Sequence, residues 1–326
     1  MKKQISKIMV TGALGQIGTE LIMALRARYG AENVVATDCR PQPSRNLRDS
    51  GPFHTVDVMD IDALDKVIRQ YDIDTVFHLA ALLSATGEQK PQLCWHVNMD
   101  GTFNVLELGV RRQMARIIIP SSIAVWGKGV PLDNTPQETV LKPATMYGVT
   151  KVCGELLGDY YVGRFGLDVR GLRYPGIISY QTPPGGGTTD YAVAIFYDAV
   201  AKGKYTCFVR EETILPMMYM PDAIRATIQL AEADYSGLRH HTDFNLAAMS
   251  FSAGELARCI GKYIPGLEVS YAPDYHQTIA DSWPRSIDDS AARQEWGWKP
   301  EWDMEAMTQD MIKHLRERLA QKGVLA

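Results

Sequence analysis

Three glycines at three-residue spacing follow the first apolar run of the chain and constrain how it can begin to fold. Residues 5–10 are rich in β-forming side chains, and Gly12, Gly15 and Gly18 come shortly after them. Apolar residues then recur with helical spacing, which predicts a strand, a tight turn and a helix. In such a unit the glycines let the backbone approach a pyrophosphate, which faces the free N–H groups of the helix N-terminus. A tight turn that binds nothing is the alternative for the glycines taken alone.

An acidic residue ends the next predicted strand. Residues 33–37 read as a strand, and Asp38 follows it about 20 residues after the last glycine. A carboxylate at this place accepts hydrogen bonds from both hydroxyls of an adenosine ribose and repels a 2′-phosphate. Arg40 comes soon after and would attract that phosphate. Asp38 outweighs it, so the sequence favours NAD over NADP.

Strand and helix patterns keep alternating through the first half of the chain. Further strands are predicted at residues 53–58, 75–80 and 116–122, with helices at 62–71 and 91–112 between them. This order predicts an α/β fold: a Rossmann-type doubly wound parallel sheet, with ligands at the carboxyl ends of its strands. The candidate residues at those ends are Gly12, Asp38, Asp57, Ala80 and Ser122.

The second half is expected to add a smaller, mostly helical substrate lobe. Amphipathic patterns at residues 252–260, 288–295 and 304–319 predict its helices. The helix predicted at residues 222–232 is expected to return to the sheet. The predicted domains are an NAD-binding domain at residues 1–175 with a returning segment at about 219–247, and a substrate lobe at 176–218 and 248–326.

A tyrosine and a lysine four residues apart form the strongest catalytic pattern. Tyr147 and Lys151 share one face of a predicted helix, about one turn apart. A phenol near pKa 10 is a poor base, and a neighbouring ammonium lowers that pKa, so the pair suits reversible proton transfer at a hydroxyl or carbonyl. Ser122 can hold the reacting oxygen, because a hydroxyl both donates and accepts. Taken alone, the spacing also occurs in many helices without function.

A glycine–threonine loop precedes another predicted helix. Residues 185–187 are three glycines, and Thr188 or Thr189 is predicted to cap a helix that begins at residue 190 or 191. Loop amides at a helix start suit a small anion such as a carboxylate, although a flexible surface turn is equally compatible. A sugar nucleotide would instead need clustered arginines for its diphosphate. Arg173, Arg210 and Arg225 are scattered in the sequence.

Composition limits the other classes of function. The 326 residues have a net charge of −4 and are 46% hydrophobic, which gives no reason to expect nucleic acid or an anionic membrane as partner. No apolar run long enough to span a membrane is present, and no apolar targeting region precedes the first strand. Five scattered cysteines predict a reducing compartment and no structural zinc. We therefore expect a cytoplasmic protein without a metal.

As a set, these motifs resemble the extended short-chain dehydrogenase/reductase superfamily. The resemblance rests on residues 11–18, Asp38, 57–58, 79–81, Asn98, 121–122, Tyr147, Lys151 and 173–176. It implies the following NAD contacts: Gly12, Gly15, Gln16, Ile17, Gly18, Asp38, Asp57, Val58, Leu79, Ala80, Ala81, Asn98, Tyr147, Lys151, Tyr174 and Ile177.

Nearly the whole chain also resembles the short-chain type of L-threonine 3-dehydrogenase. The matching segments are residues 184–196, 215–219, 245–251, 279–284 and 296–298. Members of that type usually have phenylalanine near Trp126 and at Tyr174, so the departures here replace one aromatic with another. The resemblance implies NAD-dependent oxidation of the L-threonine β-hydroxyl to 2-amino-3-oxobutyrate.

The same resemblance implies roles for individual residues. Tyr147 would be the general base, Lys151 would lower its pKa and contact the nicotinamide ribose, and Ser122 would position the substrate oxygen. The implied substrate contacts are Ser84, Ser122, Tyr147, Gly185, Gly186, Thr188, Thr189 and Trp283. A homodimer through the helices at residues 91–112 and 145–164 is expected. The alternatives are a sugar-nucleotide epimerase or dehydratase on the same fold and a non-catalytic NAD-sensing module.

Overall fold

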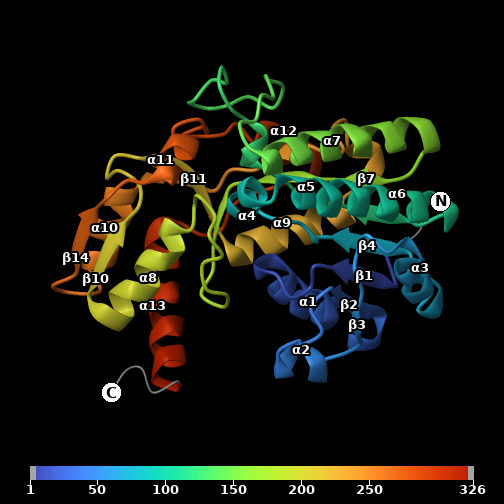
Figure 1. Cartoon of the computed structure of the whole chain (residues 1–326), viewed down its shortest axis with the longest axis horizontal. Helices are drawn as coiled ribbons and strands as arrows, with labels where there is room; N and C mark the ends of the chain where they lie inside the picture. The colour runs from blue at the N-terminus through green and yellow to red at the C-terminus, as the bar shows by residue number, and fades with distance from the viewer. Residues whose placement is uncertain (1–4, 322–326) are drawn as a thin grey trace.

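A six-stranded parallel sheet organises the first half of the chain (Figure 1). The computed structural model describes residues 5–321 and orders the strands β3-β2-β1-β4-β5-β7. Neighbouring strands all run parallel, as in the pairing of Val10 with Ala36 and Phe77. The strands are β1 (Ile8–Thr11), β2 (Val34–Asp38), β3 (Phe53–Thr55), β4 (Thr75–His78), β5 (Arg116–Ile118) and β7 (Val169–Arg170). The predicted Rossmann-type sheet is confirmed.

Helices cover both faces of this sheet, and the strands contribute side chains to two apolar cores. Ile8 and Val10 of β1 lie in the core with α1 and α9, whereas Met9 lies in the core with α3, α6 and α7. Successive strand residues point to opposite faces, so strands buried on both faces have unbroken apolar sequences. The helices are α1 (Gln16–Tyr29), η1 (Ala31–Asn33), α2 (Arg45–Asp49), α3 (Ile61–Gln70), α4 (Ser84–Gln89), α5 (Pro91–Trp95), η2 (His96–Asp100), α6 (Gly101–Arg111), η3 (Ile123–Val125), α7 (Met146–Phe165), α9 (Met220–Glu232) and η4 (Tyr235–Gly237).

Two predicted elements are interrupted in the structure. The helix predicted at residues 91–112 contains the π-helical turn η2, which carries Asn98. The strand predicted at residues 116–122 is two strands, because Pro120 has no N–H to continue the pairing. Its second part, β6 (Ser121–Ser122), joins β8 (Leu172–Tyr174) and β12 (Phe244–Asn245) in a separate sheet. This break moves Ser122 away from the line of the main sheet.

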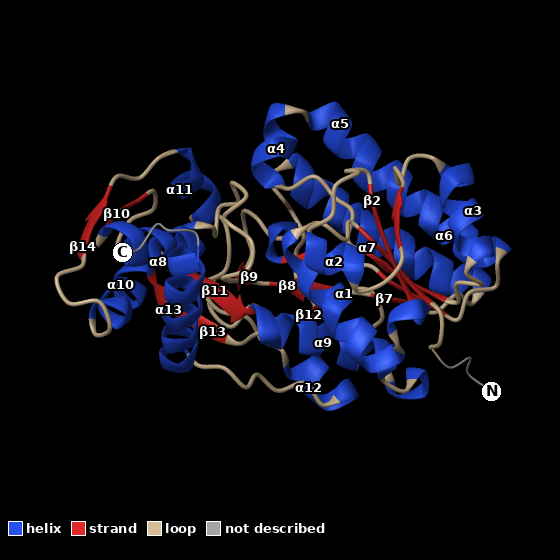
Figure 2. Ribbon diagram, turned by 90° about the horizontal axis from the view of Figure 1, so that it is seen from below, coloured by secondary structure: helices blue, strands red, loops and turns tan. Residues whose placement is uncertain are grey.

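The C-terminal lobe combines helices with two small sheets (Figure 2). Helices α8, α10 and α13 pack on one another around its apolar core. Its elements are β9 (Gly176–Ile178), α8 (Tyr191–Lys202), β10 (Lys204–Cys207), β11 (Ile214–Tyr219), β13 (Met249–Ser252), α10 (Ala253–Gly261), β14 (Glu268–Tyr271), α11 (Tyr275–Ala280) and α13 (Met304–Gln321). The lobe therefore contains more strand than the sequence patterns indicated.

The helix predicted at residues 288–295 packs against the sheet domain and not in the C-terminal lobe, where it was expected. It is α12 (Ser290–Trp296), and Ala291, Ala292 and Trp298 lie in the apolar core beside α1 and α9 rather than in that of the lobe.

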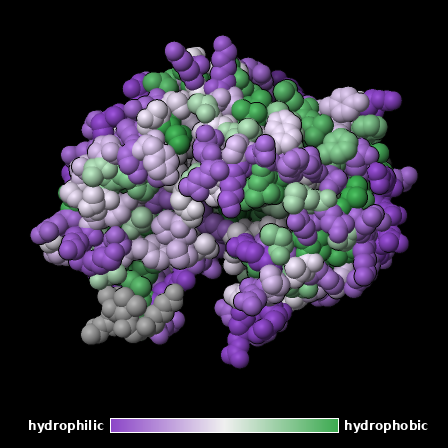
Figure 3. Space-filling model, viewed as in Figure 1, coloured by the Kyte–Doolittle hydropathy of each residue, from purple (hydrophilic) through white to green (hydrophobic). Residues whose placement is uncertain are grey.

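Figure 3 shows the surface hollowed at its lower edge, between the lobe and the sheet domain. Within residues 5–321, no helix combines the length and apolarity that crossing a membrane requires.

Candidate active site

The turn after β1 has a geometry that requires glycine. Gly12 has φ +67°, and a Cβ atom there would lie 2.6 Å from the backbone nitrogen of Ala80. The turn leads into α1, where Gly15 as N-cap residue has no side chain to cover the first N–H groups. Free N–H groups at a helix start carry the positive end of the helix dipole. This cradle fits the pyrophosphate of a dinucleotide.

Asp38 lies at the carboxyl end of β2, beside this turn. Its Oδ2 accepts a hydrogen bond from the Leu14 N–H at 2.9 Å, and its Oδ1 accepts from Arg40 Nε at 2.9 Å. Burial alone would raise the pKa of Asp38, but the hydrogen bonds from Arg40 and Leu14 outweigh it and lower that pKa. The carboxylate is therefore held in its charged form, and Arg40 is engaged with it rather than free for a phosphate.

The other predicted cofactor residues lie mostly along the same edge of the sheet. Asp57 is exposed after β3, and the next residue, Val58, is buried. Val58 packs against Gly101, because a Cβ on Gly101 would lie 2.7 Å from the Val58 side chain. Gln16 in the first turn of α1 donates from Nε2 to the carbonyl oxygen of Ile177 at 3.5 Å, which links the glycine turn to β9. The segment after β4 is formed by Leu79, Ala80 and Ala81.

Two of the predicted cofactor residues use their polar groups inside the protein. Asn98 accepts from the Leu82 N–H at 2.8 Å and donates to Thr150 Oγ1 at 3.0 Å. Tyr174 is buried, and its hydroxyl bonds to Thr227. Asn98 thus links the backbone after β4 to Thr150 of α7, which is the residue before Lys151.

The residues predicted for catalysis lie together at the start of α7. Thr145 caps this helix by accepting from the Gly148 N–H at 3.0 Å, which puts Tyr147 in the first turn. Lys151 Nζ lies 5.5 Å from the centre of the Tyr147 ring and donates to the carbonyl oxygen of Pro120 at 2.7 Å. Ser122 lies at the end of β6, two residues after Pro120, and its Oγ accepts a hydrogen bond from the Ala124 N–H at 3.2 Å.

Burial is the largest cause of the pKa shift at both members of this pair. It raises the pKa of Tyr147 to about 12, and the nearby Ser122 hydroxyl only partly opposes this. Burial also lowers the pKa of Lys151 to about 8, although Glu155 favours its charged form. Burial, Ser122 and Cys94 are the causes of the shift at Tyr147, so the lowering of its pKa by Lys151 stays a prediction. Nζ of Lys151 donates to the carbonyl oxygen of Pro120.

The glycine loop at residues 185–187 reaches α4 on the other side of Tyr147. A Cβ on Gly186 would lie 4.0 Å from that of Ala85, the neighbour of the buried Ser84. A Cβ on Gly87 of the same helix would lie 3.8 Å from the Cβ of Tyr147. The structure thus places the loop and Tyr147 on either side of α4, and the substrate roles of these residues stay a prediction.

The two threonines and the tryptophan predicted for the substrate have different surroundings. Thr189 packs on β9, where a Cβ on Gly176 would lie 2.8 Å from its own Cβ. Thr188 is buried, and its hydroxyl has no hydrogen-bond partner among the residues that the structure describes. Trp283 lies in the apolar core of the C-terminal lobe. Thr188 is therefore the residue of the three whose polar group still needs a partner.

Asp190 occupies the anion site that the sequence predicted in the loop. Its Oδ2 accepts from the N–H groups of Gly185, Gly186 and Gly187 at 2.7, 2.7 and 2.8 Å. Asp190, and not a threonine, is the N-cap residue of α8. The amides do bind a carboxylate, but it is the chain's own, so in this conformation they are not open to a substrate.

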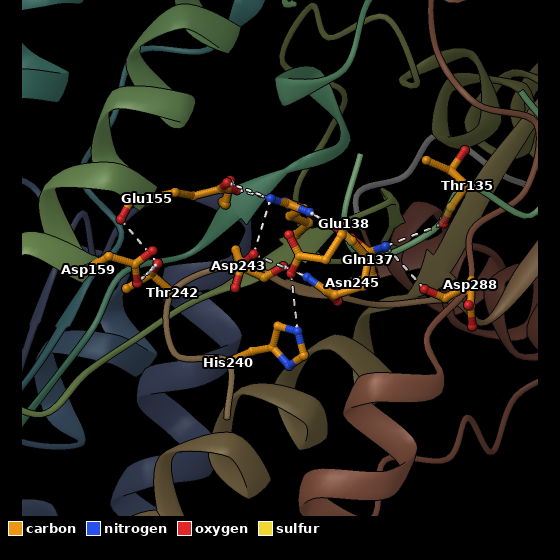
Figure 4. Close-up of polar contacts among 12 residues, drawn as sticks. Thr135, Gln137, Glu138, Glu155, Asp159, His240, Thr242, Asp243, Asn245 and Asp288 are labelled. Atoms are coloured by element: carbon orange, nitrogen blue, oxygen red, sulfur yellow. Dashed lines mark hydrogen bonds and ion pairs between the residues drawn. The ribbon is translucent and has the colours of Figure 1, made fainter. Parts of the chain in front are cut away.

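Sequence reasoning missed a buried charged network beneath the catalytic helix (Figure 4). Arg173 is 2% exposed and forms a bidentate pair with Glu155, with Nε–Oε1 at 2.9 Å and Nη2–Oε2 at 2.7 Å. Arg173 also donates to Asn245 Oδ1 at 3.1 Å, and Ser121 donates to Glu155. Glu155 is one turn beyond Lys151 on α7, so its spacing from Lys151 was the available signal.

The sequence profile of the NAD dependent epimerase/dehydratase family matches residues 8–247. The chain belongs to this family. The match spans the glycine turn, the Ser122/Tyr147/Lys151 set and the segment returning through α9, so the protein is an NAD-dependent enzyme. Membership therefore counts against the alternative of a non-catalytic NAD-sensing module.

Relatives within the family resemble the chain over nearly its full length. An uncharacterized epimerase/dehydratase from Staphylococcus haemolyticus is 47% identical over 313 residues, which cover 96% of this chain and 98% of the relative. The structure of L-threonine dehydrogenase from Clostridium difficile has a TM-score of 0.94 at 48% identity and covers 97% of this chain and 99% of that one. A monomeric L-threonine 3-dehydrogenase from a metagenome database has a TM-score of 0.92 at 48% identity, with coverages of 95% and 99%.

Epimerases of this family would need arginines free to hold a sugar-nucleotide diphosphate. Each of the three arginines considered for that role is already paired with a carboxylate. The pairs are Arg173 with Glu155, Arg210 with Asp281, and Arg225 with Asp222. The second half of the chain therefore offers little support for a sugar nucleotide as substrate.

Proposed function

We propose that the protein is an NAD-dependent L-threonine 3-dehydrogenase, which oxidises the β-hydroxyl of L-threonine to 2-amino-3-oxobutyrate. The observation that carries this proposal is the likeness, over both lobes and at 48% identity, to structures named as threonine dehydrogenases. The paired arginines favour it over the sugar-nucleotide alternative. We also infer a cytoplasmic location, because five scattered cysteines are typical of a reducing compartment.

In the mechanism we propose, Ser122 holds the reacting oxygen and Tyr147 takes its proton. The Ser122 hydroxyl lies close enough to Tyr147 to lower its pKa, so a substrate oxygen placed beside both would be within reach of the phenol. Loss of that proton develops a carbonyl at C3 and expels hydride from the same carbon. NAD, when bound, would supply the hydride acceptor, and its positive charge would favour the phenolate form of Tyr147. Lys151 adds a second positive charge on the same side of Tyr147.

The substrate's charged ends would be held by the loop and α4. The unpartnered hydroxyl of Thr188 supports a role for this residue, and the buried Ser84 and the packed Thr189 lie near the same loop. Gly185 and Gly186 would contribute by letting the backbone approach rather than through amides, which Asp190 already occupies.

The test is NADH absorbance with purified protein, NAD and L-threonine. We expect rapid reduction with L-threonine and NAD, and far less with L-allo-threonine or with NADP. Absence of reduction, together with NAD that copurifies tightly, would reject the dehydrogenase in favour of an epimerase, which cycles its cofactor without net reduction.

Asp38 should determine the choice between the two cofactors. We expect Asp38→Ala to lower the preference for NAD over NADP about tenfold or more, because it removes a repulsive carboxylate and frees Arg40 to pair with a 2′-phosphate. The measurement is kcat/KM for both cofactors. Asp49→Ala, an exposed aspartate on α2, is the matched control. An unchanged ratio of kcat/KM for NAD to kcat/KM for NADP in Asp38→Ala would show that Asp38 does not select the cofactor.

We also propose that the protein forms a homodimer through α5, α6 and α7. Figure 3 shows hydrophobic side chains gathered over these helices. The exposed members are Leu93, Trp95, Phe103, Leu156, Tyr160 and Phe165. So large an exposed apolar group is typical of a protein interface. Because one similar structure is described as monomeric, the oligomeric state needs its own measurement.

Leu156→Glu should shift this equilibrium towards monomer. Leu156 is 63% exposed on α7, and a buried charge at a dimer interface is unfavourable. We expect wild type to sediment as a dimer at micromolar concentration and Leu156→Glu to sediment mainly as a monomer. Leu132→Glu, at an exposed leucine outside the patch, should leave the dimer intact. A wild-type monomer at that concentration would reject the proposal.

A further inference from the structure

A small, partly open cavity lies next to Lys151. Its volume is about 20 Å³, and its lining includes His78, Asn98, Ser121, Lys151 and Glu155. This is enough space for one water molecule, and a buried water needs two or more polar partners. The residues around the cavity supply them, so it is suited to an ordered water rather than to an apolar void.

His78 presents an unpaired ring nitrogen in this place. The side chain is 3% exposed at the end of β4, and its Nδ1 pairs with Thr11 Oγ1 at 2.8 Å. Its Nε2 is buried and has no hydrogen-bond partner among residues 5–321. Buried polar atoms nearly always have a partner, either in the protein or in ordered water. A water in the cavity, which His78 lines, would give Nε2 its missing partner.

Lys151 has hydrogen-bonding capacity left for the same water. An ammonium has three N–H donors, and within the described part of the chain Pro120 provides the one hydrogen-bond acceptor for Nζ. Pro120 is itself part of the cavity lining, so Nζ lies at the cavity. Glu155, on the next turn of α7, is held away by Arg173 and Ser121.

The charges around the cavity suit a neutral imidazole. Burial, followed by the nearby Lys151, lowers the pKa of His78 to about 3, so the ring carries no charge at neutral pH. Glu155 on α7 and Cys94 on α5 are the titratable groups that favour the charged form of Lys151, and Tyr147 faces it from its own helix. His78 therefore offers a hydrogen-bonding nitrogen on β4 without a second positive charge.

We propose that one ordered water bridges His78 Nε2 and Lys151 Nζ, and that His78 is a positioning residue for Lys151. This inference rests on the proposed dehydrogenase for its kinetic consequence, but not for the water itself. The imidazole orients the water, and the water completes the hydrogen bonding of the ammonium that acts on Tyr147.

Two substitutions of His78 separate this role from a purely structural one. Asparagine places its amide near the position of Nδ1 and keeps the contact with Thr11, but leaves nothing at Nε2. Glutamine reaches the position of Nε2 instead. We expect His78→Asn to lower kcat about tenfold, with little change in the KM for L-threonine, because a buried hydrogen bond to a charged group is lost. His78→Gln should retain most of kcat.

The pH profile gives a second readout. Without an acceptor for one N–H, the charged form of Lys151 is less stable, so the alkaline limb of kcat should move to lower pH in His78→Asn. A structural role through Thr11 would give the opposite order, with His78→Gln impaired and His78→Asn close to wild type. That order, or two variants with unshifted limbs, would overturn the proposal.

A high-resolution crystal structure tests the water without any turnover. We expect density within hydrogen-bonding distance of both His78 Nε2 and Lys151 Nζ in the wild type, and its loss in His78→Asn. An empty cavity, or a water that contacts only one of the two groups, would overturn the bridge. If the water is present but L-threonine reduces no NAD, the bridge stands and the proposed function fails. Should His78→Asn not fold, the wild-type structure and His78→Gln still decide.

Discussion

Tyr147→Phe is expected to lower kcat with L-threonine by about a thousandfold or more while leaving NAD affinity nearly unchanged. The substitution removes one oxygen and keeps the ring. The ring positions the start of α7 by packing near Gly87 and Lys151, so the fold and the cofactor cradle around Gly12 should be preserved. The loss is large because no other group in the set can take the proton: Ser122 is a far weaker base than a phenolate.

This effect is measured by NADH absorbance for kcat and by quenching of protein fluorescence for the Kd of NAD. Tyr160→Phe is the matched control, since Tyr160 is 56% exposed on the same helix and far from Ser122 along it. Its kcat should equal that of wild type. Turnover of Tyr147→Phe within tenfold of wild type would remove Tyr147 from the role of base. Loss of NAD binding in the same variant would indicate that the phenol holds the cofactor instead.

The features that the sequence predicted well are set by short stretches of chain. The glycine turn, the strand ending at Asp38 and the spacing of Tyr147 and Lys151 each depend on fewer than about ten neighbouring residues, and periodicity reports such local order directly. The right-handed alternation of strands and helices then leaves few ways to arrange the sheet. Ser122 and Tyr147 could be paired because both follow from this arrangement.

The features that the sequence missed depend on contacts that spacing does not reveal. The amides of the glycine loop bind Asp190 because Gly186 adopts φ +91°, which turns successive N–H groups to one side. The pKa of Tyr147 is raised mainly by desolvation of its partly buried phenol, which depends on the tertiary structure and not on neighbours in sequence. The pair of Glu155 and Arg173 is formed between α7 and β8, so it required the tertiary structure.

Arg173→Leu is expected to destabilise the protein by about 3–5 kcal/mol, the range for breaking a buried ion pair by removing one partner. Arg173 makes its bidentate pair with Glu155 where both side chains are less than 5% exposed, and it also donates to the carbonyl oxygen of Gln137 at 3.2 Å. Leucine leaves the Glu155 carboxylate buried without its cation. Arg285→Leu is the control, because its pair with Asp133 is exposed and such pairs contribute about 1 kcal/mol or less.

The pH dependence of this loss should identify its cause. Burial already raises the pKa of Glu155, and Arg173 is the main group that opposes the rise. In Arg173→Leu the pKa of Glu155 in the folded state should therefore lie further above its unfolded value. A carboxyl of this kind favours the fold when it is protonated, so the destabilisation should be smaller near pH 5 and grow as pH rises.

Denaturant unfolding at pH 5 and pH 8 measures both the loss and its pH dependence. The double variant Arg173→Leu with Glu155→Leu removes the stranded carboxyl as well, and should recover much of the stability of wild type. A loss in Arg173→Leu that does not depend on pH, and that the double variant fails to relieve, would mean that Arg173 stabilises the protein mainly through Asn245 and Gln137. Recovery would instead show that α7, which carries Tyr147 and Lys151, depends on a charge pair one turn beyond its catalytic residues.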